Sequence, residues 1–157
     1  MTDSVSPEKR SDVMSKVRSK DTKPELQIRR GLYALGFRYR LHVSDLPGKP
    51  DLVFPRYKAV IFVNGCFWHG HSCSLYRFPK SNTDYWTEKI KRNVERDTSN
   101  IKRLTDAGWR ILIIWECATK GKARLPVENV LNTASEWLLS EKPNCEIAGL
   151  WEGNGCV

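Results

Sequence analysis

The spacing of apolar residues predicts a chain in which helices and short strands alternate. The first helix with a clear core-facing stripe begins near Asp21 and ends before Gly36. Its stripe consists of Leu26, Ile28, Leu32 and Leu35. Strand patterns follow at residues 37–43, 51–54 and 59–63, separated by turns that contain proline or glycine. Short strands joined in this way favour an antiparallel meander.

The longest predicted helix covers residues 84–107, with Thr83 as its N-cap and Gly108 after its end. Its apolar stripe consists of Trp86, Ile90, Val94, Ile101 and Leu104. Asp97 stands where this stripe requires a core residue. Because an unpaired buried charge is costly, we expect Asp97 to have a specific partner. That partner is either the backbone or an arginine in a structural role, or a histidine in a functional one.

A continuously apolar segment at residues 110–115 predicts a strand that is buried on both faces. Together with residues 59–63 and the long helix it forms a β-α-β unit, which is parallel by default. Parallel neighbours end at the same edge of a sheet, so Cys117 is expected to lie near Cys66. Residues 126–139 predict a last amphipathic helix, and residues 143–157 have weak patterns that we interpret as a C-terminal tail. Residues 1–142 then form a single domain.

The first 20 residues predict a basic helix that begins at Ser6-Pro7-Glu8 and carries few apolar side chains, among them Met14 and Val17. Such a helix either docks lightly on the body of the protein or forms an arm that lies along DNA. Charged helices usually present a solvated face, which favours the first alternative when this segment is considered by itself.

Composition narrows the possible partners. The chain has 157 residues, 40% of them hydrophobic, which is typical of a globular domain. Its net charge of +8 favours an anionic partner such as nucleic acid, although an ordinary basic enzyme is the alternative. Neither a secretory signal nor a membrane span is recognisable, so an intracellular protein is expected. The odd number of cysteines, 5, points to metal ligation or free thiols rather than a disulfide framework.

Residues 60–73 concentrate the reactive side chains. A strand pattern, Val-Ile-Phe-Val, is followed by Asn-Gly-Cys-Phe-Trp-His-Gly-His-Ser-Cys. Cys66, His71 and Cys73, joined by Cys117, make a plausible tetrahedral Cys3His set for a structural zinc ion. The alternative is a group of reduced, buried thiols. A zinc ion here would connect the loop after one strand to the end of its parallel neighbour.

The remaining residues of this region suggest hydrolysis of a phosphodiester. His69 is suited to act as a general base, and Asp97 on the long helix is suited to orient it. Asp51 and Glu25 offer the carboxylate oxygens that Mg²⁺ prefers. The adjacent aromatic rings of Phe67 and Trp68 would stack on bases or wedge between base steps, or else they pack in the core.

Taken together, these segments resemble the very short patch repair (Vsr) endonucleases, whose core is similar to that of type II restriction enzymes. The resemblance covers about residues 10–117 and rests on four motifs. They are Pro-Gly-Lys-Pro-Asp at 47–51, Val-Ile-Phe-Val-Asn-Gly-Cys-Phe-Trp-His-Gly-His at 60–71, Tyr-Trp followed by Lys-Ile-Lys-Arg-Asn-Val-Glu-Arg-Asp within 85–97, and Gly-Trp-Arg-Ile-Leu-Ile-Ile-Trp-Glu-Cys at 108–117. The resemblance implies an α/β fold with a mixed sheet flanked by helices, an N-terminal helical arm at residues 1–20 and a structural zinc site. It also implies an enzyme that nicks one strand beside a T:G mismatch left by deamination of 5-methylcytosine.

The resemblance assigns a role to each candidate residue. Asp51 would bind catalytic Mg²⁺, Glu25 would organise the metal waters, and His69 would act on water with support from Asp97. Zinc would be bound by Cys66, His71, Cys73 and Cys117. The DNA contacts would come from a wedge of Phe67, Trp68 and Trp86, from Met14 and Val17 on the opposite side, and from Lys89 and Asn93 at the mismatched pair.

Two positions depart from the family pattern. Val63 stands where the family commonly has threonine, and it can still offer a metal its backbone carbonyl. Asn64 stands where the family often has histidine, and an amide cannot act as a general acid at neutral pH. A metal-bound water could protonate the leaving group instead.

The expected setting is the bacterial cytoplasm in association with the nucleoid, with a monomer acting on mismatched DNA alongside other repair proteins and without a membrane partner. Two other functions fit part of the pattern. One is a zinc-stabilised DNA-binding module without catalysis, and the other is a restriction endonuclease that cuts matched DNA.

Overall fold

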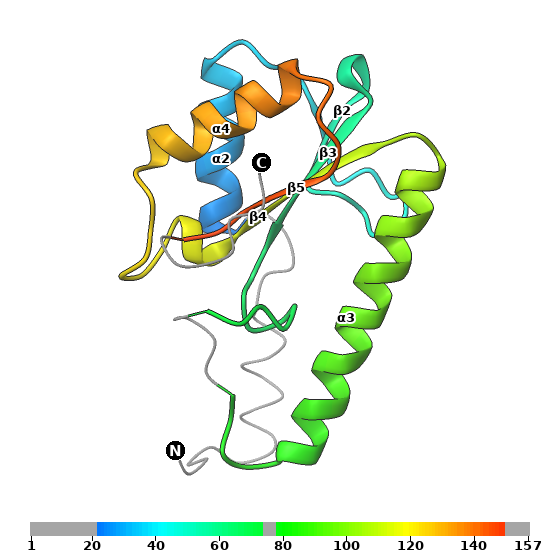
Figure 1. Cartoon of the computed structure of the whole chain (residues 1–157), viewed down its shortest axis with the longest axis vertical. Coiled ribbons are helices and arrows are strands. Elements are labelled where there is room, and N and C mark those ends of the chain that lie inside the picture. The colour runs from blue at the N-terminus through cyan, green and yellow to red at the C-terminus, as the bar shows by residue number, and fades with distance from the viewer. Residues whose placement is uncertain (1–21, 74–77, 150–157) are drawn as a thin grey trace.

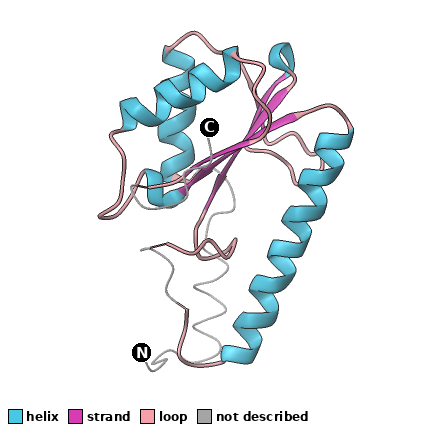
Figure 2. Cartoon of the chain, viewed as in Figure 1, coloured by secondary structure: helices cyan, strands magenta, loops and turns pink. Residues whose placement is uncertain are grey.

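The computed structural model describes residues 22–73 and 78–149, which form a mixed α/β fold around one five-stranded sheet (Figures 1 and 2). The predicted N-terminal arm, with Met14 and Val17, lies outside the described residues. The strands are β1 (Arg40–Leu41), β2 (Leu52–Phe54), β3 (Ala59–Asn64), β4 (Arg110–Trp115) and β5 (Cys145–Ile147). The helices are α2 (Lys23–Ala34), α3 (Thr83–Asp106) and α4 (Val127–Leu139), with short 3-10 turns η1 (Pro55–Tyr57) and η2 (Glu116–Ala118).

The sheet has the order β1-β2-β3-β4-β5. The first three strands form the predicted antiparallel meander, and β3 pairs with β4 in parallel across the helix α3. The β-α-β prediction is therefore confirmed, and β4 is buried along nearly its whole length. The interpretation of everything after residue 142 as a tail is wrong for β5, which extends the sheet parallel to β4. This strand has only 3 residues, too few for a recognisable pattern.

Helices cover both faces of the sheet unequally. On one face α2 and α4 lie against each other, and their apolar stripes join the main core beneath them (Figure 1). On the other face, within residues 22–73 and 78–149, the one helix that packs on the sheet is α3, which does so with its C-terminal half through Ile101 and Leu104. The N-terminal half of α3 extends past the sheet, where Tyr85 is 56% exposed. The side chains of this projecting half are therefore free of the sheet and can contact the loop after β3.

This arrangement corrects the predicted stripe of α3. Val94, expected in the core, is 40% exposed, and its neighbour Asn93 is buried instead. Ile90 and Leu104 keep their predicted burial, and the stripe fails at Val94. Beyond the sheet the partner is the loop after β3, and a polar residue can face that loop if its hydrogen bonds are satisfied.

Several element boundaries differ from the sequence predictions. The strand predicted at residues 37–43 is reduced to β1, because Phe37 turns into the core and His42 adopts a left-handed backbone conformation with φ of +49°. Helix α3 begins at Thr83 itself, with Asn82 as its N-cap. Thr22 caps α2, and its side chain accepts a hydrogen bond from the backbone N–H of Glu25.

Within the described part of the chain, no helix is long and apolar enough to cross a membrane.

Candidate active site

A cavity of about 610 Å³ opens where the ends of several elements meet. It is lined by residues from the end of β1, the start of β2, the end of β3, the loop that follows β3, and the middle of α3. Five of the lining residues were singled out from the sequence: Asp51, Val63, Asn64, His69 and Asp97. The tertiary structure therefore gathers candidates that are far apart in the chain.

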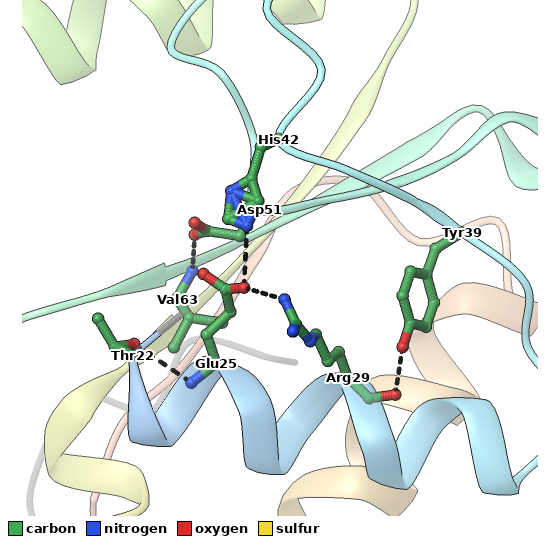
Figure 3. A network of polar contacts seen from close by, with 7 residues as sticks. All are labelled: Thr22, Glu25, Arg29, Tyr39, His42, Asp51 and Val63. Atoms are coloured by element: carbon green, nitrogen blue, oxygen red, sulfur yellow. Dashed lines mark hydrogen bonds and ion pairs between the residues drawn. The ribbon is translucent and has the colours of Figure 1, made fainter. Parts of the chain in front are cut away.

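Asp51 stands directly before β2 and is held by the neighbouring strand. Its Oδ2 accepts a hydrogen bond of 2.7 Å from the backbone N–H of Val63 on β3 (Figure 3). Glu25, in the first turn of α2, is 1% exposed and faces Asp51. The sequence analysis proposed Glu25 and Asp51 as carboxylates for a cation, and the packing of α2 against the sheet places the two side by side.

In addition to facing Asp51, the carboxylate of Glu25 contacts Arg29 and His42. Its Oε2 accepts a hydrogen bond of 2.9 Å from Nη1 of Arg29 and lies 3.0 Å from Nε2 of His42 (Figure 3). Donor atoms of Glu25, His42 and Asp51 all lie within 4.8 Å of one another, a spacing that suits a metal ion. His42 and Arg29 were not recognised from the sequence.

Burial raises the pKa of Asp51 from 3.8 to about 7. The neighbouring carboxyl group of Glu25 contributes to the increase, and the hydrogen bond from Val63 opposes it. Two buried carboxyl groups this close favour a shared proton or a cation between them. A divalent cation supplies the missing positive charge without a proton.

His69 is paired with Asp97, as the functional alternative predicted. Nδ1 of His69 lies 2.5 Å from Oδ2 of Asp97, and each side chain is about a quarter exposed. A carboxylate at Nδ1 orients the ring and stabilises the imidazolium that forms when the other nitrogen takes up a proton. The partner of Asp97 is therefore a histidine that lines the cavity.

A second group of possible ligands lies beside the cavity. It consists of Cys66, His71, Cys73 and Cys117, whose donor atoms lie within 4.8 Å of one another. The predicted approach of Cys117 to Cys66 is confirmed, because the backbone N–H of Cys117 donates to Sγ of Cys66 at 3.4 Å. The backbone N–H of Gly149 donates in turn to Sγ of Cys117 at 3.3 Å. Backbone donors aimed at sulfur are the outer contacts that a thiolate ligand requires.

The protonation states of this group also suit a metal ion. Burial lowers the pKa of His71, which keeps its imidazole neutral, the form that binds metals. The ring stacks on Trp115 with centroids 4.2 Å apart. Burial raises the pKa of the Cys66 and Cys117 thiols, so without a metal they stay protonated, and metal binding would release their protons. Cys145, by contrast, is disulfide-bonded, so metal ligation or free thiols do not account for every cysteine.

Gly70 allows two neighbouring histidines to serve different sites. Its φ of +66° is a conformation that side chains with a Cβ disfavour, and it turns the chain between His69 and His71. A Cβ at this position would lie 3.0 Å from Val94 and 3.1 Å from Ile90 on α3. The loop therefore lies so close to α3 that a side chain at position 70 would crowd Val94 and Ile90.

Aromatic rings cluster at the end of the loop nearest the start of α3. The rings of Phe67, Trp68 and Trp86 contact one another edge to face, with centroids 5.2 to 6.0 Å apart. All three are half-buried, so they belong to neither the interior nor the free surface. Tyr85, which the sequence analysis did not single out, extends the cluster with its ring 5.1 Å from that of Trp86.

Asn93 connects this cluster to α3. It is 6% exposed, its side-chain amide donates to the backbone carbonyl of Trp68 at 2.9 Å, and its Oδ1 accepts from Arg96 at 2.9 Å. Lys89, one turn earlier, is half-buried. In this structure the Asn93 side chain supports the loop.

Comparison with known proteins decides the family. The family model for the DNA mismatch endonuclease Vsr matches residues 2–75. The chain is 41% identical over 138 residues to the DNA mismatch endonuclease Vsr of Escherichia coli K12, covering 88% of each chain. The chain belongs to the Vsr family. It is also 46% identical over 134 residues to the type II nicking enzyme V.XorIIP of Xanthomonas oryzae pv. oryzae, covering 84% of this chain and 98% of that protein. It is 50% identical over 123 residues to the nicking enzyme V.NmeAIP of Neisseria meningitidis, covering 78% and 88%.

Membership of the Vsr family confirms the resemblance drawn from the sequence motifs. The motifs left out His42. Leu41 pairs with Leu52 in the antiparallel ladder, so His42, the residue that follows β1, stands opposite Asp51. The meander was predicted, but its register was not, and only the register brings His42 to the site.

Proposed function

We propose that this protein is a DNA mismatch endonuclease that nicks one strand of a duplex beside a T:G mismatch by metal-dependent hydrolysis. The observation that carries the proposal is the single cavity that holds both Asp51 and the His69–Asp97 pair. A carboxylate site for a cation and an oriented base are the two components that hydrolysis of a phosphodiester requires. The named relatives are mismatch endonucleases and nicking enzymes.

Asp51 would bind Mg²⁺ with the backbone carbonyl of Val63, and Glu25 would arrange the surrounding waters. The cation would supply positive charge for the phosphate and its transition state. His69 takes a proton from the attacking water, and Asp97 holds the ring and stabilises its charged form. The leaving oxygen needs a proton from another source. Asn64 lines the cavity but cannot donate one at neutral pH, so a water molecule fills this role.

Cys66, His71, Cys73 and Cys117 are proposed to bind a structural zinc ion. The protein would supply all four ligands and leave no position open for water or substrate, which is typical of a structural rather than a catalytic zinc site. Such an ion would join the loop after β3 to η2. We also infer that the mixed sheet corresponds to a restriction-endonuclease core, with the meander presenting Asp51 at its edge.

DNA contacts are proposed for the aromatic cluster and for Lys89 and Asn93. Half-buried rings at the edge of a basic protein are suited to enter a distorted duplex. Asn93 would have to exchange its contact with Trp68 for a base, so DNA binding and movement of the loop would be linked. The DNA contacts of Met14 and Val17 stay predictions. So do the monomeric state, the location in the bacterial cytoplasm and the association with other repair proteins.

The function is tested by incubating end-labelled T:G and matched duplexes with Mg²⁺ and resolving the strands on a denaturing gel. Nicking of one strand of the T:G duplex alone is expected. Asp51→Ala should abolish nicking and retain mismatch binding, whereas Asp45→Ala, a change of an exposed carboxylate in the same loop, should retain both. Full nicking by Asp51→Ala would contradict the assigned role.

The same assay separates the alternative functions. Mismatch binding without nicking under any divalent cation would indicate a zinc-stabilised DNA-binding module. Cleavage of both strands of matched DNA would indicate a restriction endonuclease.

A further inference from the structure

The metal site proposed above contains a nitrogen donor as well as oxygen donors. Nε2 of His42 lies 3.0 Å from Oε2 of Glu25, and donor atoms of both residues lie within 4.8 Å of a carboxylate oxygen of Asp51 (Figure 3). Adjacent ligands of an octahedral ion with bonds of about 2.1 Å lie about 3 Å apart, and opposite ligands about 4.2 Å apart. The three side chains are therefore close enough together to surround one ion.

The backbone holds His42 at this position. Its N–H donates to the carbonyl of Asp51 at 3.3 Å, which continues the β1–β2 pairing by one residue. Its φ of +49° lies in the left-handed region, which costs a residue with a Cβ about 1 kcal/mol or more. Strained backbone conformations of this kind concentrate at functional sites because the surrounding structure must maintain them.

A simple ion pair with Glu25 is the competing explanation for His42. Arg29 already pairs with the same oxygen of Glu25 at 2.9 Å, so a second cation is not needed to neutralise that carboxylate. His42 also lines the cavity, and its side chain is 20% exposed, so an ion and its waters can reach it. Access to the cavity and the spacing to both carboxylates favour ligation.

We propose that His42 is a direct ligand of the catalytic metal ion beside Asp51, so that the site offers a nitrogen donor as well as oxygen donors and prefers a first-row transition ion such as Mn²⁺ to Mg²⁺. This inference rests on the proposed function, in which Asp51 binds the cation. Mg²⁺ favours oxygen ligands, whereas imidazole binds transition metals more strongly. His42 then determines which cation the enzyme uses, while His69 keeps its role toward water.

The test measures metal binding directly, without DNA. Full-length protein loaded with one zinc ion per chain is titrated with Mn²⁺, and free Mn²⁺ is followed by its EPR signal, alone and in competition with Mg²⁺. The key variant is His42→Asn, because asparagine tolerates the left-handed backbone and replaces the nitrogen ligand with an oxygen. We expect Mn²⁺ affinity to fall on the order of tenfold and Mg²⁺ affinity to change by less than about twofold.

Pulsed EPR of bound Mn²⁺ reports ligation independently of affinity. A ¹⁴N coupling from a bound imidazole is expected in the wild type and in His69→Gln, the matched change of the other cavity histidine, and is expected to be absent in His42→Asn. His42→Gln serves as a second variant, and thermal unfolding without Mn²⁺ verifies that each variant is folded. Persistence of the ¹⁴N coupling in folded His42 variants, or an equal loss of Mn²⁺ and Mg²⁺ affinity, would overturn the proposal.

Asp51→Ala separates this inference from the proposed function. If Asp51→Ala loses metal binding and nicking while His42→Asn keeps full Mn²⁺ affinity, the role of His42 alone is wrong. If Asp51→Ala still nicks, the catalytic assignment itself is wrong, and the inference about His42 is overturned with it.

Discussion

Oδ2 of Asp97 lies 2.5 Å from Nδ1 of His69, and this contact joins the middle of α3 to the loop after β3. Asp97 interrupts the apolar stripe of its helix at the point where α3 leaves the sheet. Its partner lines the same cavity as Asp51. The polar residue in the stripe is thus explained by its contact with a histidine of the cavity rather than by a hydrogen bond to the backbone.

Replacing Asp97 with asparagine should impair turnover far more than DNA binding. Asparagine can still contact the ring, but it does not stabilise an imidazolium, so single-turnover nicking should fall on the order of 10²-fold or more. Affinity for T:G duplex, measured by fluorescence anisotropy, should change by less than about threefold. Glu95→Gln, at an exposed acid on the same helix, should leave both quantities unchanged. A parallel loss of nicking, affinity and folding would make Asp97 structural.

The raised pKa of Asp51 predicts how stability depends on pH. The folded protein binds a proton at Asp51 up to about pH 7, whereas the unfolded chain releases it near pH 4. The stability contributed by this proton is complete below pH 4 and is lost as the pH rises through 7. Asp51→Asn resembles the protonated form, so without added Mg²⁺ or Mn²⁺ it should be more stable than the wild type at pH 8, on the order of 3 kcal/mol.

Urea unfolding from pH 5 to pH 8 measures this effect. The advantage of Asp51→Asn should shrink toward pH 5, and Asp45→Asn at an exposed position should show no such trend. Saturating Mn²⁺ or Mg²⁺ should stabilise the wild type more than the variant, because the ion binds the folded carboxylate. An advantage that is the same at all pH values would contradict the raised pKa.

A methyl group at Gly70 should disturb both candidate sites at once. Gly70→Ala combines a positive φ with contacts of 3.0 and 3.1 Å to Val94 and Ile90, so it should cost about 1–3 kcal/mol and displace His69 and His71 together. Gly36→Ala has φ of +99° without any atom nearby, and it provides the control for backbone strain alone. Nicking and zinc content should fall in Gly70→Ala only. Equal behaviour of the two variants would show that the close approach to α3 is unimportant.

Removal of the zinc proposed for the cysteine cluster should loosen the fold near the active site. Elemental analysis should find one zinc ion per chain, and Cys117→Ser should reduce this content and lower the melting temperature by several degrees. The loss of stability should exceed that of Ser140→Ala, a distant change that removes a side-chain hydrogen bond to Trp137. If the protein contains no zinc and Cys117→Ser leaves the stability unchanged, the four residues do not bind metal and the cysteines among them are free thiols.

Asn93 should contribute to stability as well as to DNA recognition. Asn93→Ala leaves the carbonyl of Trp68 without this donor, which should cost about 1–3 kcal/mol in thermal or urea unfolding without DNA. Lys89→Ala, one turn earlier on the helix, should have little effect on stability and should act on DNA affinity instead. If Asn93→Ala is as stable as the wild type, its role is confined to DNA.

Local patterns in the sequence were sufficient for the longer elements and for the cysteine cluster. Periodicity identified the long helix, because most of its apolar residues face the sheet or the loop after β3, and a continuous apolar run identified β4, which is buried on both faces. The rule for parallel strands brought Cys117 to Cys66, because both residues follow the ends of paired strands. The four motifs at 47–51, 60–71, 85–97 and 108–117 together indicated the family before any geometry was considered.

By itself, then, the sequence determined the longer elements, the reactive loop after β3, the pairing of β3 with β4, and the Vsr family. The tertiary structure alone decided how the carboxylates and His42 meet and where β5 lies. The register of a strand of 2 residues placed His42 beside Asp51, and the packing of α2 placed Glu25 against both. The projection of α3 past the sheet buried Asn93 and exposed Val94. These outcomes depend on strand register and on what covers each part of a helix. Hydrophobic periodicity does not specify strand register. It also does not specify burial along a part of a helix that packs on a loop instead of on the core.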